Sequence, residues 1–254
     1  MKLADGKDIY NLCKTLWPIT RSITGDGVRE TLSIIKHEIA DLIIHEVPTG
    51  VQCFDWKIPK EWNIKDAYIV DPNGRKVINF KDNNLHVVSY STPVSKSMSL
   101  SELQKHLYSI PEQPDAIPYV TSYYHERWGF CLTENQRKLL KDGKYQVYID
   151  SELSDGSLTY GELIIPGKSE KEIFLSTYIC HPSMANNELS GPTVTTYLTK
   201  WIQSQTREYT YRIVFIPETI GSICYLSRNL EVMKKNIIAG YNISCVGDDN
   251  TYSY

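Results

Sequence analysis

The spacing of hydrophobic residues divides the chain into three stretches of different character. Residues 8–45 are predicted to be helical, because apolar residues recur every three or four positions in 9–16 and again in 32–39. A glycine-rich turn separates these two runs, and Thr24 or Asp26 is the expected N-cap of the second helix. The first stretch therefore predicts a pair of helices.

The stretch from 48 to 165 predicts mainly β-strands. It contains short runs rich in β-branched and aromatic residues, which are broken by turn signals such as Asp-Pro-Asn-Gly at 71–74 and Asp-Gly at 155–156. Two short helices are expected within it, near 99–107 and 133–141. We therefore predict an inserted β-rich domain that covers 48–165.

After residue 165, apolar strands alternate with amphipathic helices. A regular alternation of this kind is typical of parallel strands that are covered by helices. The predicted fold class is therefore α/β, a mostly parallel sheet flanked by helices, which residues 1–47 and 166–254 form together. The predicted strands are 172–178, 211–216 and 236–246, and the helices between them are 191–205 and 220–235.

The composition is that of an ordinary soluble globular protein. Of the 254 residues, 41% are hydrophobic and 22% are charged, and the net charge of −3 argues against a nucleic-acid surface, which is usually basic. No apolar run reaches the ~20 residues of a membrane span, and the N-terminus lacks the apolar core of a signal peptide. The six cysteines form no Cys-x-x-Cys pair. We predict a cytoplasmic, disulfide-free protein without nucleic-acid or membrane partners, and homo-oligomerisation stays open.

Chemically active side chains follow each of the three predicted strands. The first strand runs into ICHPSMANNELSG at 179–191, which contains His181, Asn187 and Glu188. Glu218 follows the second strand and Asp248 follows the third. Because ligands of open α/β sheets bind beyond the carboxyl ends of the strands, we expect these groups to converge at one edge of the sheet.

Their chemistry suits a metal-dependent hydrolase. Zinc takes imidazole nitrogen and carboxylate oxygen as ligands, lowers the pKa of a bound water and polarises a carbonyl. We expect His181, Asp248 and an oxygen from Asn187 or Glu188 to hold the metal, with Glu218 as the general base. Each residue also has a structural interpretation, as part of a turn or as a helix cap, and their occurrence at successive strand ends favours the functional one.

The same motifs resemble those of the bacterial zinc aminopeptidases, the co-catalytic zinc exopeptidases. ANNELSG at 185–191 aligns with that family's first metal-binding loop, ETIG at 218–221 with its Glu-Glu-x-Gly motif, and NISC at 242–245 with its Asn-x-Asp-Met stretch. More closely, PITRSITGDGVRETL, CHPSMANNELSGP, IPETIGS and CVGDD resemble bacterial polysaccharide-biosynthesis proteins with an aminopeptidase-like domain. This resemblance covers nearly the whole chain and implies a zinc-dependent, aminopeptidase-like hydrolase with an inserted β-rich domain.

The chain departs from the zinc aminopeptidase pattern at several metal positions. Asn187, Thr219 and Ser244 stand where that family has metal-binding carboxylates, and no histidine follows His181. The comparison therefore implies one zinc ion rather than two, while Glu218 keeps the general-base position. The chain ends just after the third predicted strand, so we expect a C-terminally truncated chain with little activity of its own.

Three functions remain open at this point. The main hypothesis is an exopeptidase-type hydrolase that acts on a peptide or another small, amide-bearing substrate. The second is a catalytically degenerate peptidase fold that serves as a binding protein in surface polysaccharide biosynthesis, because metal positions are lost. The third is an amino-sugar amidase or deacetylase, since the same metal-activated water would attack its amide bond.

Two further clusters have both a functional and a structural interpretation. Residues 21–30, RSITGDGVRE, place Arg21 and Arg29 around a glycine-rich turn, which suits either an anion at a helix N-terminus or a plain connection between helices. Residues 122–130, SYYHERWGF, suit either a substrate-facing lobe or a half-buried hairpin. The structural interpretation is favoured for both.

Overall fold

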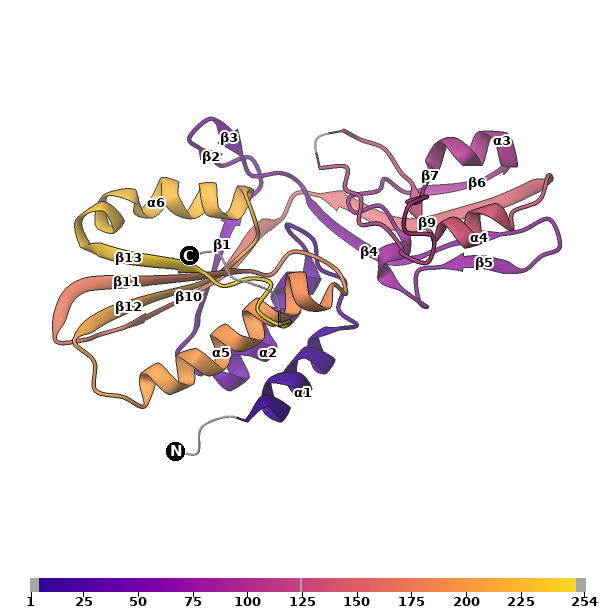
Figure 1. Ribbon diagram of the computed structural model, residues 1–254. Coiled ribbons are helices and arrows are strands. Elements are labelled where there is room, and N and C mark those ends of the chain that lie inside the picture. The colour runs from indigo at the N-terminus through magenta and orange to yellow at the C-terminus, as the bar shows by residue number, and fades with distance from the viewer. Residues whose placement is uncertain (1–4, 124, 250–254) are drawn as a thin grey trace. The chain divides into compact units, whose positions relative to one another are not determined.

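The computed structural model describes residues 5–123 and 125–249. Two compact units make up the chain, each with its own core (Figure 1). Unit 1 combines Met1–Glu61 with Asp155–Tyr254, and unit 2 comprises Trp62–Ser154. The inserted unit is therefore shorter than the predicted 48–165, because the strand at 157–165 pairs within the sheet of unit 1.

The sheet of unit 1 has five strands in the order β1-β10-β12-β11-β13. β11 lies between β12 and β13 and is parallel to both, whereas β10 is antiparallel to β1 and to β12. The expected mostly parallel sheet is thus a mixed sheet. Only residues 166–168 connect β10 to β11, which is too short for the crossover that parallel strands require. The elements are α1 (Gly6–Leu16), α2 (Asp26–Glu38), β1 (Ile43–Pro48), β2 (Gln52–Cys53), β3 (Trp56–Lys57), β10 (Ser157–Ile165), β11 (Ser169–Tyr178), the π-helix η3 (Ala185–Leu189), α5 (Ser190–Gln203), β12 (Tyr209–Ile216), α6 (Ile220–Asn236) and β13 (Ile237–Asn242).

Helices cover both faces of this sheet. α2 and α5 lie on one face and α6 on the other, as Figure 1 shows. Side chains alternate along each strand accordingly: Leu175 of β11 packs in the core beneath α2 and α5, and its neighbour Phe174 stacks on Tyr225 of α6 with ring centroids 6.3 Å apart. The three-layer arrangement follows from this alternation of buried side chains.

The N-terminal prediction needs two corrections. Residues 43–48 form β1 rather than the end of a helix, because they pair with β10 from Ile43 opposite Glu162. The N-cap of α2 is Gly25, with φ 104° and no side-chain hydrogen bond, so neither Thr24 nor Asp26 holds that position. Glycine adopts such a φ at little cost, which side-chain capping rules do not anticipate.

Unit 2 is a four-stranded sheet in the order β5-β4-β9-β6, with short helices over a separate apolar core. Both expected helices are present, and the predicted turn at 71–74 connects β4 to β5. The elements are β4 (Glu61–Val70), β5 (Lys76–Asn79), the 3-10 helix η1 (Asn84–His86), β6 (Val94–Ser99), α3 (Leu100–Leu103), the 3-10 helix η2 (Gln104–His106), β7 (Leu107–Tyr108), β8 (Phe130–Cys131), α4 (Glu134–Lys138) and β9 (Lys144–Ser154).

We expect Asp71→Asn to destabilise unit 2 at neutral pH. The backbone N–H of Arg75 donates to Asp71 Oδ1 at 2.9 Å, and this bond, with those from the Arg75 side chain and Asn73, lowers the pKa of Asp71. A lowered pKa means that the ionised form stabilises the fold above the unfolded pKa, and that this contribution is lost as the pH falls through the folded pKa. Thermal unfolding midpoints of wild type and variant should therefore differ at pH 7 and converge in acid. Asp142→Asn, at an exposed position, serves as the control. If the difference between the two unfolding midpoints is as large in acid as at pH 7, ionised Asp71 does not stabilise the fold.

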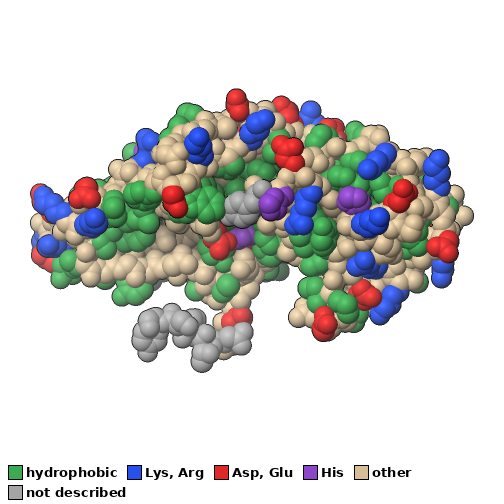
Figure 2. Space-filling model, turned by 90° about the horizontal axis from the view of Figure 1, so that it is seen from above, with side chains coloured by type: hydrophobic (Ala, Val, Ile, Leu, Met, Phe, Trp, Pro, Cys, Tyr) green, Lys and Arg blue, Asp and Glu red, His purple; other side chains and the backbone are tan. Residues whose placement is uncertain are grey.

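The surface and the cysteines give little information about function. Figure 2 shows basic and acidic side chains interspersed over the face in view, with hydrophobic side chains between them. All six cysteines are free thiols. Within the described residues, no helix combines the length and apolar character that crossing a membrane requires.

Candidate functional site

The loops after the three parallel strands meet at one edge of the unit 1 sheet. Because β11 lies between β12 and β13, the loop after β11 reaches both neighbouring loops. His181 Nε2 lies 3.1 Å from Glu218 Oε2 in the loop after β12. The structure thus brings His181 and Glu218 together, as a direct consequence of strand order.

Strained backbone concentrates in these same loops. Five described residues other than glycine have a positive φ, and three of them are Ser183 at 27°, Thr219 at 57° and Cys245 at 52°. One lies after each of the three parallel strands. Such conformations cost free energy, persist only where the surroundings impose them, and cluster at functional sites.

A buried cluster of three potential ligands forms beneath Glu218. Cys180, His181 and Glu188 each offer an atom within 4.8 Å of the others. His181 Nδ1 is 2.9 Å from Glu188 Oε2 and 3.7 Å from Cys180 Sγ. The Cys180 thiol also accepts the backbone N–H of Glu218 at 3.2 Å, so the thiol links the loops after β11 and β12.

Arg21 holds Glu188 and the backbone of His181 in place through hydrogen bonds. Its Nε donates to Glu188 Oε1 at 3.2 Å and to the His181 carbonyl at 3.0 Å, while Nη1 donates to the Leu16 carbonyl at 2.8 Å. The side chains of Arg21 and Glu188 are each 1% exposed. Arg21 therefore neutralises a fully buried carboxylate and holds the backbone of the neighbouring histidine at the same time.

Burial dominates the electrostatics of the cluster. It raises the pKa of Glu188 above its ordinary value, against the opposing effects of His181 and Arg21. It raises the pKa of the Cys180 thiol well above its ordinary value and lowers that of Arg21. Glu218, by contrast, has a 53% exposed side chain. The site thus combines a buried set of donors with one carboxylate that solvent and substrate can reach.

Asn187 and Asp248 make contacts with residues outside this cluster. Asp248 Oδ2 accepts a hydrogen bond from Asn186 Nδ2 at 2.6 Å, and Asn187 Nδ2 lies 4.0 Å from Cys245 Sγ. Among the described histidines, cysteines and acidic residues, Asp248 is not part of the group of Cys180, His181 and Glu188. Of the four predicted metal ligands, the structure brings His181 and Glu188 together, beside the thiol of Cys180.

The Asn-Asn-Glu-Leu-Ser-Gly segment serves chiefly to connect two loops. Ser190 Oγ accepts the backbone N–H of Val246 at 3.0 Å, and Asn186 Oδ1 accepts that of Gly247 at 2.8 Å. Gly191 allows the close approach, because a Cβ there would lie 2.3 Å from the Ile243 carbonyl oxygen. The Ser-Gly pair therefore has a packing reason that is independent of any metal.

We expect Gly191→Ala to destabilise unit 1 by about 1–3 kcal/mol, the usual cost of overpacking a filled site. The added methyl group would also lie 2.5 Å from Thr177 Oγ1, and both neighbours are fixed by the sheet. Urea unfolding measures the change. Gly6→Ala, where a Cβ meets nothing within 4 Å, is the matched control and should be close to neutral.

Sequence reasoning missed Arg21 and Cys180 as members of the site. Cys180 had a visible signal, since it stands beside His181 directly after a strand. Arg21 had none, because its partner Glu188 is 167 positions away along the chain. Arg29, the other arginine of the 21–30 cluster, is paired with Glu61 and Asp26, so the helix–connection interpretation of that cluster agrees with the structure.

The aromatic cluster at 122–130 is internally packed. Trp128 stacks on His106 with ring centroids 3.7 Å apart, and Lys96 Nζ lies 5.1 Å from the centroid of the same ring. Tyr123 packs edge-on against Tyr90 with centroids 5.1 Å apart. Trp128 and Tyr123 are half-buried, as the structural interpretation expected, but the described residues of this segment form no hairpin, because Phe130 begins β8, which pairs in parallel with β7. Tyr124 lies outside the described residues.

The donor atoms fit a zinc-type cation in kind and approximately in spacing. Zinc binds sulfur, nitrogen and oxygen at about 2.0–2.3 Å, so two donors on one tetrahedral ion lie about 3.4–3.8 Å apart. Cys180 Sγ and His181 Nδ1, at 3.7 Å, match this spacing, whereas Nδ1 and Glu188 Oε2, at 2.9 Å, would have to separate by about half an ångström. Arg21 engages Oε1 of Glu188, whereas Oε2 lies against His181 Nδ1.

Comparison with solved structures places the fold in the aminopeptidase-like class. A zinc aminopeptidase from Bacillus subtilis superposes with a TM-score of 0.62 at 12% identity, over 97% of this chain and 71% of that chain. A peptidase M28 precursor from Shewanella amazonensis gives a TM-score of 0.60, also at 12% identity, over 92% and 70%. At this identity the likeness concerns the fold alone.

The family follows from nearer relatives. The family described as "Domain of unknown function (DUF4910)" matches residues 10–254, and the chain belongs to it. A Clostridium acetobutylicum protein named "Putative polysaccharide biosynthesis protein with aminopeptidase-like domain" is 55% identical over 249 residues, which are 98% of this chain and 57% of that protein. A crystal structure titled "putative peptidase" from the same organism has a TM-score of 0.94 at 56% identity, over 96% and 58%. The chain thus spans little more than half the length of these relatives.

Proposed function

We propose that this chain carries the metal-binding half of an amide hydrolase active site of the aminopeptidase type. The observation that carries the proposal is the position of His181, between buried Glu188 at 2.9 Å and exposed Glu218 at 3.1 Å, in the loop after β11, the middle one of the three parallel strands. An imidazole between a buried and an accessible carboxylate is suited to holding a cation next to a base.

Each residue has a separate task in this proposal. Cys180, His181 and Glu188 hold one zinc ion, and Arg21 keeps Glu188 ionised and in place. When bound, zinc supplies a Lewis acid that polarises an amide carbonyl and lowers the pKa of water. Glu218, which is half exposed, accepts the proton of the attacking water and returns it to the leaving amine.

The substrate we propose is small and carries an amide bond. The name of the Clostridium acetobutylicum relative joins polysaccharide biosynthesis to an aminopeptidase-like domain. An N-acylated amino sugar or a short peptide attached to a sugar would unite the two parts of that name, because each contains an amide that the same chemistry cleaves.

Metal binding by the purified chain tests the proposal directly. We expect cobalt(II), as a spectroscopic substitute for zinc, to produce a thiolate-to-cobalt charge-transfer band in the near ultraviolet, because Cys180 is a ligand. Cys180→Ser should abolish that band, and His181→Ala should weaken cobalt and zinc binding by at least about tenfold. Cys245→Ser, which removes an exposed thiol outside the cluster, is the matched control and should retain the band.

Two other results would change the assignment. If Asp248→Asn weakens binding while Cys180→Ser does not, the ligands are the predicted His181 and Asp248 rather than the buried cluster. If neither metal binds at all, the proposal fails, and a binding protein with a degenerate peptidase fold becomes the better description.

A further inference from the structure

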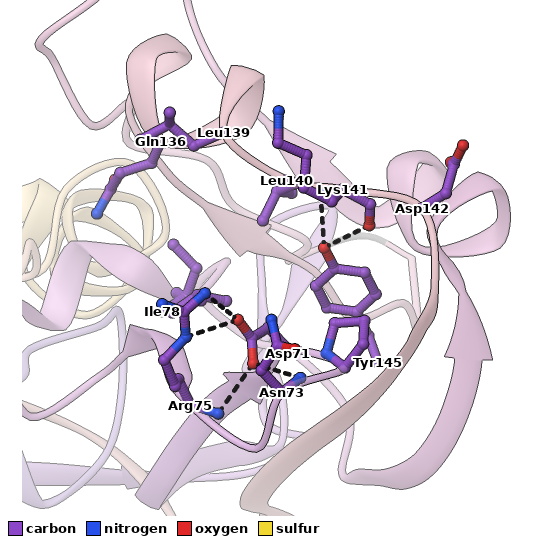
Figure 3. Close-up of a pocket in the computed structure, with 12 residues that line it drawn as sticks. Asp71, Asn73, Arg75, Ile78, Gln136, Leu139, Leu140, Lys141, Asp142 and Tyr145 are labelled. Atoms are coloured by element: carbon purple, nitrogen blue, oxygen red, sulfur yellow. Dashed lines mark hydrogen bonds and ion pairs between the residues drawn. The ribbon is translucent and has the colours of Figure 1, made fainter.

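Unit 2 contains a cavity of about 580 Å³ that is independent of the strand-end site. It lies between the β4–β5 turn and β5 on one side and the end of α4 with the following turn on the other. Figure 3 shows Gln136, Leu139 and Leu140 along one wall and Arg75 and Ile78 opposite them. Its volume falls within the usual range for small-molecule sites, about 300–1,000 Å³.

Both walls of this cavity are held in place by hydrogen bonds. Asp71 accepts the backbone N–H groups of Asn73 and Arg75, each at 2.9 Å, which fixes the β4–β5 turn. On the opposite wall, the Tyr145 hydroxyl donates to the Lys141 carbonyl at 2.8 Å and accepts the Lys141 N–H at 3.1 Å. The cavity is therefore preformed, which reduces the entropy lost when a ligand binds.

Arg75 presents an oriented guanidinium at this cavity. Its Nε and Nη2 donate to Asp71 Oδ2 at 3.0 and 2.8 Å, so one edge of the planar group is fixed. The Arg75 side chain is 73% exposed, and Nη1 has no partner among the described residues. The remaining edge of the guanidinium, Nη1 with the second N–H of Nη2, has the geometry that binds two oxygens of an oxyanion.

Gln136 adds a second donor on the facing wall. Its Oε1 accepts the backbone N–H of Thr133 at 2.9 Å in the capping box of α4. The amide oxygen is thereby committed, and Nε2 is the atom left to hydrogen-bond a ligand. The Asp142 side chain extends away from Arg75 in Figure 3. The polar groups that face the cavity from Arg75 and Gln136 are therefore donors.

The rest of the lining combines apolar side chains with Asp71, whose carboxylate is paired with Arg75, and with Asn73, Lys141 and Asp142. Ile78 and Tyr145 are buried in the floor, and Val77 and Leu140 are half-buried. Leu139 on the rim is 72% exposed, which leaves a large apolar side chain uncovered beside the donors. An apolar floor with convergent donors is the arrangement that orients an amphipathic ligand.

We propose that this cavity binds a small amphipathic carboxylate. The carboxylate bridges the free edge of Arg75 and Nε2 of Gln136, and the apolar body lies on Val77, Ile78 and Leu139. Asp71 acts as a positioning residue that sets the orientation of Arg75. This inference does not depend on the proposed hydrolase activity, since no residue of the strand-end site takes part.

Binding of 4-phenylbutanoate to the full chain tests the proposal. Backbone amide chemical shifts in two-dimensional NMR should move at Val77, Ile78 and Gln136, and the uncharged 4-phenylbutanol should bind at least about tenfold more weakly, because a charge-assisted hydrogen bond is lost. Gln136→Glu keeps the capping acceptor and replaces the donor with a negative charge, so it should weaken the carboxylate at least tenfold while α4 stays folded. Arg75→Gln should have the same effect.

The controls distinguish binding at a specific site from nonspecific binding to an apolar surface. Lys138→Gln removes a charge from the same helix outside the cavity lining and should leave the affinity unchanged. Butyl phosphate replaces the carboxylate with a phosphate, and equal or tighter binding of it would overturn the choice of carboxylate. Equal affinity for 4-phenylbutanol, or unchanged binding in both Gln136→Glu and Arg75→Gln, would overturn the site itself.

Discussion

Arg21→Met should lower the free energy of unfolding of unit 1 by about 3–5 kcal/mol, the cost of leaving a buried charge without its partner. The substitution keeps the length of the side chain but removes the donors to Glu188 Oε1 and to the His181 and Leu16 carbonyls. Since burial already raises the pKa of Glu188, this carboxyl group would take up a proton more readily in the variant. Equilibrium unfolding in urea measures the loss.

A double-mutant cycle separates charge pairing from packing. Glu188→Gln in the Arg21→Met background removes the uncompensated charge, so the double variant should be more stable than Arg21→Met alone. Lys168→Met, which disrupts an ion pair with 77% and 63% exposed side chains, is the control for loss of a surface charge and should cost less than about 1 kcal/mol. An equally small effect of Arg21→Met would show that the buried pair is not a stability determinant.

Glu218→Gln should reduce amide hydrolysis by about 10²–10⁴-fold, which is the usual contribution of a general base. The variant keeps the size of the side chain and leaves Cys180 and Glu188 untouched, so its zinc content should equal that of the wild type. Initial rates on aminoacyl-nitroanilides and on N-acetylated amino sugars also decide which amide is the substrate.

The matched control for this experiment is Glu208→Gln. Glu208 is an exposed glutamate before β12, at the opposite end of the strand from Glu218. Its removal should not alter the rate. If Glu218→Gln and wild type hydrolyse the substrate equally fast, Glu218 is not the base, whether or not a metal is bound.

The sequence predicted the part of the site that follows from the order of strands and turns along the chain. A polar turn after each apolar strand placed His181 and Glu218 at one sheet edge, and the adjacency of β11 and β12 then brought them to 3.1 Å. Asp248 also follows a parallel strand, yet its carboxylate bonds to Asn186. The sequence predicted which residues follow each strand. It did not predict the direction in which each side chain points, because the conformation of the loop sets that direction.

The sheet also shows which features the sequence predicts and which it does not. Alternating strands and helices after residue 165 correctly predicted β11, β12 and β13 as parallel neighbours. Residues 157–165 resembled the preceding β-rich stretch, so their pairing with both β1 and β12 was missed. Hydrophobic alternation specifies that a segment is a strand, but it does not specify the partner to which its backbone groups bond.

By itself, the sequence determined the α/β class of the fold, the family resemblance and the three polar loops that follow the parallel strands, because periodicity and turn residues are local properties. Only the tertiary structure decided that Arg21 pairs with Glu188, that Cys180 lies beside the His181 ring, and that Asp248 bonds to Asn186. These are contacts between side chains brought together by sheet pairing and helix packing. Their partners are distant along the chain, and burial, which sets their charge states, exists only once the core has formed.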